Sequence, residues 1–207
     1  MTNVAVIYYS STGNVHQLAE AAATAAEKAG GEVRLRRVAE IAPDSVIAAT
    51  PDWAKHVEQT KDIPVAALED IEWADVVLIG TPTRFGLPAS QIKQFIDTTG
   101  GLWFQGKTVN KVCSSFTSTS STHGGQESTI LALNNTFYHW GAIIVPPGFA
   151  DPVQFLPGNG NPYGASSVSA NAAANVNPEN LSAVEFQARR AVEIATALKT
   201  GWAAAAV

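Results

Sequence analysis

The chain has 207 residues, a formal charge of −5 and one cysteine, Cys113. The length predicts a single domain, 1–207, with a substantial core, while one cysteine excludes an internal disulfide and fits a reducing compartment. The acidic balance, without a lysine and arginine cluster, argues against nucleic-acid binding. No apolar run reaches the roughly 20 residues of a membrane span, and no secretory signal is visible. We therefore expect a cytoplasmic protein without a membrane span.

The first feature along the chain is an apolar run, Val4 to Tyr9, followed by a hydroxyl-rich loop and a helical pattern over 15–29. Such a run is typical of a parallel strand covered on both faces. The start of the next helix offers backbone N–H groups without intrahelical partners and the positive end of the helix dipole. Small hydroxyl side chains and Gly13 surround that point, which suits a phosphate. An ordinary helix cap would have the same composition.

The segment from 33 to 65 contains a short strand and an irregular stretch. A strand is predicted at 33–38, where interleaved arginines indicate a position near the sheet edge. Three prolines punctuate 43–65. A stretch this long without clear periodicity is usually an excursion with its own role. We interpret 43–65 as an insertion with one short helix, used in subunit contact or as a wall of the active site; a loose surface loop is the alternative.

The remaining chain alternates strands and helices. Further strands are predicted at 75–80, 109–116 and 142–145. Helices are predicted at 88–98, 126–139 and 177–198, and a long loop at 149–177. The last helix has Asn177 as its cap and Pro178 in its first turn, a preferred arrangement. Five apolar strands alternating with helices predict an α/β fold, a doubly wound parallel sheet with helices on both faces.

Three loops of unusual composition follow strand ends, at 10–15, 81–86 and 117–125. In such sheets ligands bind outside the carboxyl ends of the strands, at the switch point of strand order. In the second loop, an aromatic ring beside backbone N–H groups suits a flat heterocycle, although a turn packed by Phe85 would look the same. The third loop could cover the other side of that ring, or be a flexible polar loop. Neither a nucleoside triphosphatase loop nor a Gly-x-Gly-x-x-Gly motif is present, which favours a monophosphate over a tightly held dinucleotide.

Six stretches together resemble a known family. The stretch 10–14, Ser-Ser-Thr-Gly-Asn, resembles the phosphate loop of flavodoxins, which bind FMN. The other five stretches are 80–86, 99–103, 123–127, 139–141 and 162–165. These resemble the tryptophan-repressor-binding (WrbA) type of NAD(P)H:quinone oxidoreductase. The resemblance implies a flavodoxin-like fold with strand order 2-1-3-4-5 and FMN as the cofactor.

The resemblance also implies roles for individual residues. The FMN phosphate would be held by Ser10, Ser11, Thr12, Gly13, Asn14 and Val15. The isoalloxazine edge would be contacted by Pro82, Thr83, Arg84 and Phe85. The ring and the ribityl chain would be contacted by Ser118, Thr119, Ser120, Ser121, Thr122, His123 and Gly124. His139 and Trp103 would be the catalytic residues, with His139 approaching the flavin. Trp103, Thr12 and Tyr163 would line the place of the quinone or nicotinamide.

The implied function is two-electron reduction of quinones to hydroquinones by ping-pong hydride transfer. NADH or NADPH would pass a hydride to FMN and leave, and a quinone would then take the same place. Trp103 would form a flat wall with Tyr163, and His139 would hydrogen-bond a quinone oxygen or donate a proton to it. Without the resemblance, a histidine at the end of a helix such as His139 is more often a capping or packing residue, and Trp103 could simply anchor its loop.

Other functions and assembly states remain open at this level. A one-electron carrier of flavodoxin type and a flavin-binding regulatory protein are the alternatives. The resemblance implies a homotetramer, for which Trp53, Trp140 and the 149–177 loop are candidate contacts. The histidines show no metal-ligand spacing, so no metal site is expected. The sequence does not decide between NADH and NADPH, nor which quinone is used.

Overall fold

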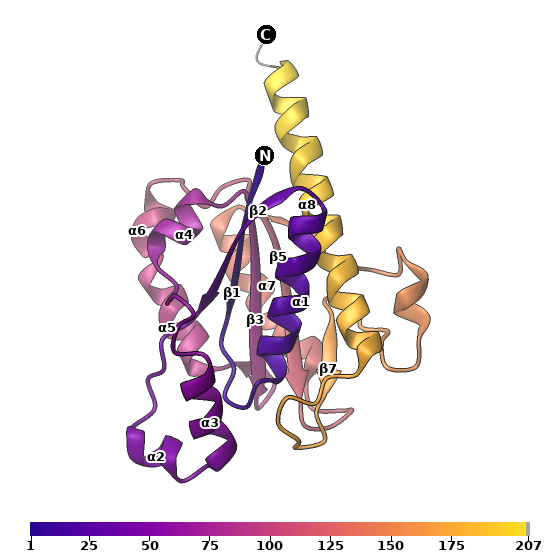
Figure 1. Cartoon of the computed structure of the whole chain (residues 1–207). Helices are drawn as coiled ribbons and strands as arrows, with labels where there is room; N and C mark the ends of the chain where they lie inside the picture. Colours follow the sequence, from indigo (N-terminus) through magenta and orange to yellow (C-terminus); the bar gives the residue numbers. More distant parts are fainter. Residues whose placement is uncertain (206–207) are drawn as a thin grey trace.

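A computed structural model describes residues 1–205 and contains a twisted, mainly parallel sheet (Figure 1). Its main strands are β1 (Thr2–Tyr8), β2 (Gly31–Arg37), β3 (Val76–Arg84), β5 (Val112–Thr119) and β6 (Ile143–Ile144). They lie in the order β2-β1-β3-β5-β6, with parallel neighbours. Because β5 and β6 are the fourth and fifth predicted strands, the predicted order 2-1-3-4-5 is confirmed. A short strand, β4 (Leu87–Pro88), pairs antiparallel with β3.

The central strands are buried on both faces, as the unbroken apolar runs predicted. Along β1, Val4 and Val6 belong to one hydrophobic cluster, whereas Ala5 and Ile7 belong to the other. This division follows from the alternation of side chains along a strand. The first cluster is covered by α1 (Asn14–Lys28) and α8 (Pro178–Ala205). The second is covered by α5 (Ser90–Thr98), α6 (Gly100–Phe104) and α7 (Gln126–Trp140). The sheet is therefore doubly wound.

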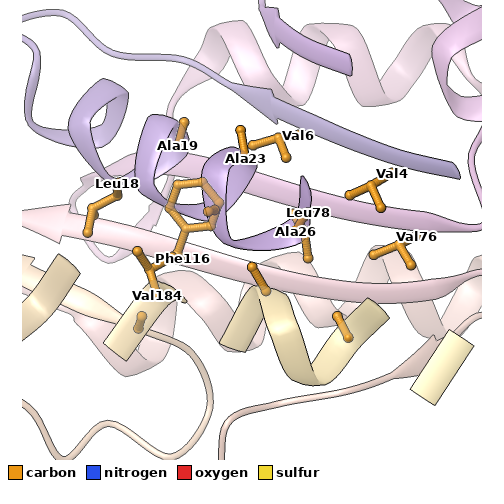
Figure 2. Packing of buried hydrophobic residues seen from close by; sticks show 14 of the residues in the cluster. Val4, Val6, Leu18, Ala19, Ala23, Ala26, Val76, Leu78, Phe116 and Val184 are labelled. Carbon is orange, nitrogen blue, oxygen red and sulfur yellow. The ribbon is translucent and has the colours of Figure 1, made fainter. Parts of the chain in front are cut away.

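Alanines let α1 lie close to the sheet. Its inward face presents Leu18, Ala19, Ala23 and Ala26 to valines and leucines of the strands (Figure 2). Four alanines of α8, at 183, 188, 191 and 195, belong to the same cluster. Small side chains on both helices allow close approach to the sheet and to each other, and Tyr8 and Phe116 of the strands are the largest buried side chains of this cluster.

The edge strand β2 is fastened by a helix that the sequence did not indicate. Arg34 and Arg36 lie on the same face of β2 and pair with the buried Asp70 of α4 (Leu68–Trp73) at 3.3 and 3.1 Å. The Arg34 guanidinium also lies 3.9 Å from the ring centroid of Trp73, in cation–π contact. Arg34 and Arg36 therefore bind α4 to the edge strand β2.

Two irregular segments contain more structure than the sequence predicted. The insertion 43–65 carries two helices, α2 (Asp44–Ala48) and α3 (Pro51–Gln59), instead of one. The 149–177 segment was predicted as loop, which is wrong for η1 (Pro152–Phe155) and β7 (Ser166–Val168). β7 pairs with the last three residues of β5, 117–119, which were expected in the third loop. These strand residues are serines, threonines and one valine, so they lack the apolar signal of the other strands.

Buried hydrogen bonds join α8 to β5 and to the backbone that precedes β7. The Gln187 side chain donates to the Ser114 hydroxyl at 2.6 Å and accepts from the Ala165 N–H at 2.6 Å. Both bonds are buried. They pair the Gln187 carboxamide of α8 with β5 and with the backbone just before β7, so its buried donor and acceptor are both satisfied. No helix within residues 1–205 has the length and apolar character needed to cross a membrane.

Gly80 provides a test of packing beneath the first loop. A Cβ atom there would lie 2.3 Å from Phe116 Cε2 and 2.9 Å from Val15 Cγ1. Both neighbours are buried, so Gly80→Ala is expected to lower the free energy of unfolding by about 2–3 kcal/mol. Urea denaturation measures this change. Gly100→Ala is the control, because a Cβ there meets nothing within 4 Å and alanine favours the helix; an equal loss in both variants would contradict the account.

Candidate functional site

A cavity of about 240 Å³ lies at the carboxyl ends of β1, β3 and β5. It is lined by Ser10, Ser11, Thr12, Asn14, Val15, Pro82, Thr83, Arg84, Ser118, Thr119, Ser120, Ser169, Asn171 and Ala172. The three loops singled out in the sequence therefore meet, as the switch-point rule requires. We call this space the loop cavity.

The first loop presents the beginning of α1 to the loop cavity. Gly13 adopts the left-handed conformation, with φ +94°, and no side chain caps the helix. The Gly13 N–H donates to the Ser10 hydroxyl at 3.0 Å, which holds the loop in a tight turn. The first amides of α1 thus remain available at the positive end of the helix dipole. Together with three hydroxyl side chains, this donor set fits a phosphate.

A segment that sequence reasoning missed, 169–175, forms one wall of the loop cavity. The buried side chain of Asn14 donates to the Ala172 carbonyl at 2.9 Å and accepts from the Asn175 N–H at 2.8 Å. The Ala174 N–H donates to the Thr12 carbonyl at 2.9 Å. Ala174 has φ +44°, which is strained for a residue with a Cβ. The segment is fixed against the first loop, and an alanine-rich sequence gave no signal of it.

The second loop supplies a positive charge that the first loop lacks. Arg84 Nη2 donates to the Ser11 hydroxyl at 3.3 Å, and Nη1 donates to the Thr83 carbonyl at 2.9 Å. Arg84 is the only lysine or arginine that lines the loop cavity within the described chain. An anion there would meet dipoles, hydroxyls and one guanidinium, and a charge-assisted hydrogen bond is about twice as strong as a neutral one. The donor set fits the phosphate end of FMN.

Hydroxyl contacts fix the second and third loops. The Thr83 and Thr129 hydroxyls lie 2.8 Å apart, which ties the end of β3 to α7. The Ser118 and Ser167 hydroxyls lie 2.9 Å apart, which ties the end of β5 to β7. Phe85 has φ +54° and is fully exposed, so its ring stands outside the loop cavity. The aromatic wall expected from Phe85 is thus at the rim.

Several predicted residues lie away from the loop cavity. The cavity lining does not include Gly13, Phe85, Ser121, Thr122, His123, Gly124, Trp103, His139 or Tyr163. Gly13 shapes the turn behind the hydroxyls, whereas Thr122 lines a neighbouring cavity. Tyr163 is partly exposed, and its N–H donates to Asn161 Oδ1 at 3.1 Å. These assignments stay predictions that depend on the bound state or on assembly.

Trp103 and His139 lie together in a separate cavity of about 480 Å³ between α5, α6 and α7. Trp103 Nε1 donates to the His139 backbone carbonyl at 2.8 Å. The contact uses the backbone of His139, so its imidazole is not committed to the indole. Trp140 and Lys93 also line this cavity. The two predicted catalytic residues are thus adjacent to each other but not to the loop cavity of the same chain.

Glu40 connects the insertion to the first loop. Its Oε2 accepts from the Tyr9 hydroxyl at 2.8 Å and from Trp53 Nε1 at 3.0 Å. Its Oε1 accepts from Gln91 Nε2 at 2.7 Å and from the two amides that follow it, both at 2.9 Å. Burial acts to raise the pKa of Glu40, but the hydrogen bonds to its ionised form prevail and hold the pKa below its usual value. One carboxylate thus joins Tyr9, the residue after β1, to α3 and α5 next to Ser10.

The insertion also places a buried histidine behind the first loop. The ring centroids of His56 and His16 lie 5.3 Å apart, and His16 stacks on Tyr8 at 5.1 Å. Burial, together with the neighbouring His16, lowers the pKa of His56 to about 4. A Cβ at Gly13 would lie 3.5 Å from His56 Nδ1. A neutral His56 therefore packs against the turn. Within residues 1–205, no three side chains of metal-ligating type form a possible metal site.

Comparison with known proteins identifies the family to which this chain belongs. Residues 2–154 match the family model described as NADPH-dependent FMN reductase. The chain belongs to the NADPH-dependent FMN reductase family. A Deinococcus radiodurans protein named NAD(P)H dehydrogenase (quinone) is 46% identical over 195 residues, covering 94% of this chain and 96% of the relative. A Paracoccus denitrificans protein of the same name is 41% identical over 208 residues, covering 97% of each.

Solved structures agree with this membership at the level of the fold. A WrbA-like flavodoxin from Agrobacterium tumefaciens superposes with a TM-score of 0.67 at 23% identity, covering 95% of this chain and 98% of the other. A flavodoxin from the domain Archaea superposes with a TM-score of 0.58 at 14% identity, covering 95% and 99%. The resemblance proposed from the sequence motifs and the flavodoxin-like fold are both confirmed.

The carboxylate of Glu40 makes a testable contribution to stability. Glu40→Gln removes the charge and part of the accepting capacity, and is expected to lower the free energy of unfolding by about 2–3 kcal/mol at pH 7. Because the pKa of Glu40 in the folded protein lies below its ordinary value of 4.5, the contribution is present above pH 4.5 and is lost as pH falls through the folded pKa. Urea denaturation at pH 7 and at pH 3–5 measures both effects.

The control is Glu32→Gln, an exposed position on β2. We expect this control to leave the stability at pH 7 within about 0.5 kcal/mol of the wild type. If Glu40→Gln is as stable as the control and keeps the wild-type dependence on pH, Glu40 does not hold the insertion in place.

Proposed function

We propose that this chain is an FMN-dependent NAD(P)H:quinone oxidoreductase that reduces quinones by two electrons. The observation that carries the proposal is the uncapped start of α1, surrounded by hydroxyls and Arg84 at the carboxyl ends of the strands. Membership of a family that includes proteins named NAD(P)H dehydrogenase (quinone) confirms the enzyme class and FMN expected from the sequence.

The loop cavity has separate regions for the parts of FMN. Ser10, Ser11 and Thr12, with the first amides of α1, would bind the phosphate, and Arg84 would balance its charge. The end of β5 and its loop would face the ribityl chain and one side of the ring. Bound FMN supplies the ability to accept a hydride from a nicotinamide and to pass two electrons to a quinone. The residues that line the loop cavity would hold the ring in place and would have to leave one of its faces accessible to substrates.

The open face requires walls that one chain does not supply at the loop cavity. We propose that the chain forms a homotetramer in which Trp103 and His139 border the loop cavity of a neighbouring subunit. Exposed apolar side chains on α6 and α7 support this arrangement, namely Trp103, Phe104, Leu131 and Tyr138. A group of exposed apolar side chains of this kind usually marks an interface.

In this assembly each chain contributes distinct roles. The indole of Trp103 would cover the flat ring of a quinone or nicotinamide, with Phe85 and Tyr163 as further aromatic walls. The His139 imidazole would hydrogen-bond the quinone oxygen or donate a proton to it as negative charge develops. We also retain cytoplasmic localisation as part of the proposal.

Purified protein loaded with FMN and mixed with NADH or NADPH and benzoquinone tests the function directly. The expected result is nicotinamide oxidation coupled one-to-one to hydroquinone formation in the absence of oxygen. A one-electron carrier or a regulatory flavoprotein would retain the yellow cofactor without such turnover, and that result would overturn the proposal.

Trp103→Ala tests the substrate wall. Loss of the stacking surface should lower kcat/KM for benzoquinone about 10-fold or more, because an aromatic contact contributes about 0.5–1.5 kcal/mol beyond its buried area. The Kd for FMN, measured by flavin fluorescence, should change less than about 2-fold. Trp202→Ala is the matched control, since Trp202 is 47% exposed against 51% for Trp103 and lies on α8. An equal loss of FMN binding and turnover in Trp103→Ala would make Trp103 structural.

A further inference from the structure

A second polar cavity, of about 350 Å³, lies next to the loop cavity. Its polar lining consists mainly of amide side chains, with one carboxylate: Gln126, Asn159, Asn161, Asn177, Asn180 and Glu127. We call it the carboxamide cavity. The first turns of both α7 and α8 border it, because Gln126 and Asn180 belong to them.

The two cavities share a wall. On β7, Ser166 and Val168 line the carboxamide cavity, whereas the Ser167 hydroxyl points the other way and lies 2.9 Å from that of Ser118 in the loop cavity. The third loop also lies between the two cavities, since Ser120 lines the loop cavity and Thr122 lines the carboxamide cavity. A ligand anchored over the loop cavity and long enough to cross this loop would enter the carboxamide cavity.

Its side chains are held in place, with hydrogen-bonding capacity left over. Asn180 Nδ2 donates to the Gly158 carbonyl at 2.6 Å and to Asn159 Oδ1 at 2.9 Å, so the floor is fixed. Gln126 is 9% exposed, and its carboxamide has no hydrogen-bond partner within the described residues 1–205. Its side-chain nitrogen and oxygen are not among the buried unpaired atoms, so they are accessible and offer the cavity a donor and an acceptor.

The charges of the carboxamide cavity select among ligands. No lysine, arginine or histidine lines it within the described chain, whereas Glu127 does. A second carboxylate, Glu179, accepts from the Gly158 N–H at 3.0 Å at its edge. A phosphate there would face uncompensated negative charge. Amides and carboxylates instead match the hydroxyls of a neutral sugar, because each hydroxyl both donates and accepts.

We propose that the carboxamide cavity binds the adenosine ribose of the nicotinamide dinucleotide and thereby selects NADH over NADPH. The inference rests on the proposed function, which requires a nicotinamide donor at the loop cavity. Gln126 and Glu127 hydrogen-bond the two ribose hydroxyls. The same Glu127 carboxylate repels a 2′-phosphate, which is the group that distinguishes NADPH from NADH.

Steady-state kinetics with both nucleotides test the charge argument. The wild-type enzyme is expected to have a kcat/KM for NADH at least about 10-fold above that for NADPH. Glu127→Gln should lower this NADH-to-NADPH ratio about 5–10-fold, because a partly exposed charge pair a few ångströms apart has an effect of that order. Glu127→Lys should lower it further. Glu185→Gln, an exposed position on α8 outside the cavity, is the matched control and should leave the ratio unchanged.

Binding of a fragment tests the cavity without turnover. Isothermal titration calorimetry of the FMN-loaded protein should give a lower Kd for ADP-ribose than for its 2′-phosphorylated form. Gln126→Ala should weaken ADP-ribose about 5–10-fold while leaving the Kd for FMN unchanged.

The outcomes separate this inference from the proposed function. Absence of turnover with either nucleotide would overturn the proposed function. Turnover in which NADPH is equally good, or in which Glu127→Gln and Glu127→Lys keep the wild-type ratio, would overturn the ribose assignment alone.

Discussion

The structure depends on the free amides at the start of α1, which lie where β1 and β3 end and are capped by no side chain. Unpaired backbone donors at a helix dipole are a cost unless an anion or water satisfies them. Several residues shape or charge the space around the start of α1. Gly13 makes the turn at positive φ, Gly80 leaves room for Val15 beneath it, and Arg84 brings charge from the second loop. A fold built this way is arranged to hold a phosphate.

The insertion at 43–65 and the segment at 169–175 both stabilise the turn of the first loop at 10–14. Glu40 ties Trp53 of the insertion to Tyr9, the residue before the loop, and a neutral His56 packs behind it. From the opposite side, Asn14 fixes the 172–175 backbone. Both segments lack the regular pattern of the core, yet both are held by specific hydrogen bonds to the loop. Their irregularity reflects a function in shaping the site rather than weak structure.

The sequence predicted those parts of the molecule whose signal is local. Strands buried on both faces appear as apolar runs, and Asn177 caps α8 as expected, accepting from the Glu179 N–H at 2.9 Å. The three loops were singled out by their composition, and they were expected to form one site because ligands bind at the carboxyl ends of the strands. Contacts made across the fold carried no such signal. Examples are the 169–172 wall of the loop cavity and the serine-rich β7, whose positions depend on partners over 100 and about 50 residues away, respectively. Trp103 and His139 were identified by family resemblance, and their distance from the loop cavity emerged only in three dimensions.

The central claim is that the start of α1 binds the phosphate of FMN, and comparing FMN with riboflavin tests it most directly. The two ligands share the ring and ribityl chain and differ only in the phosphate. Fluorescence titration of the flavin-free protein should give a Kd for FMN at least about 100-fold lower than that for riboflavin, since two or more charge-assisted hydrogen bonds contribute about 1.5–3 kcal/mol each. Equal affinities for the two flavins would contradict the account.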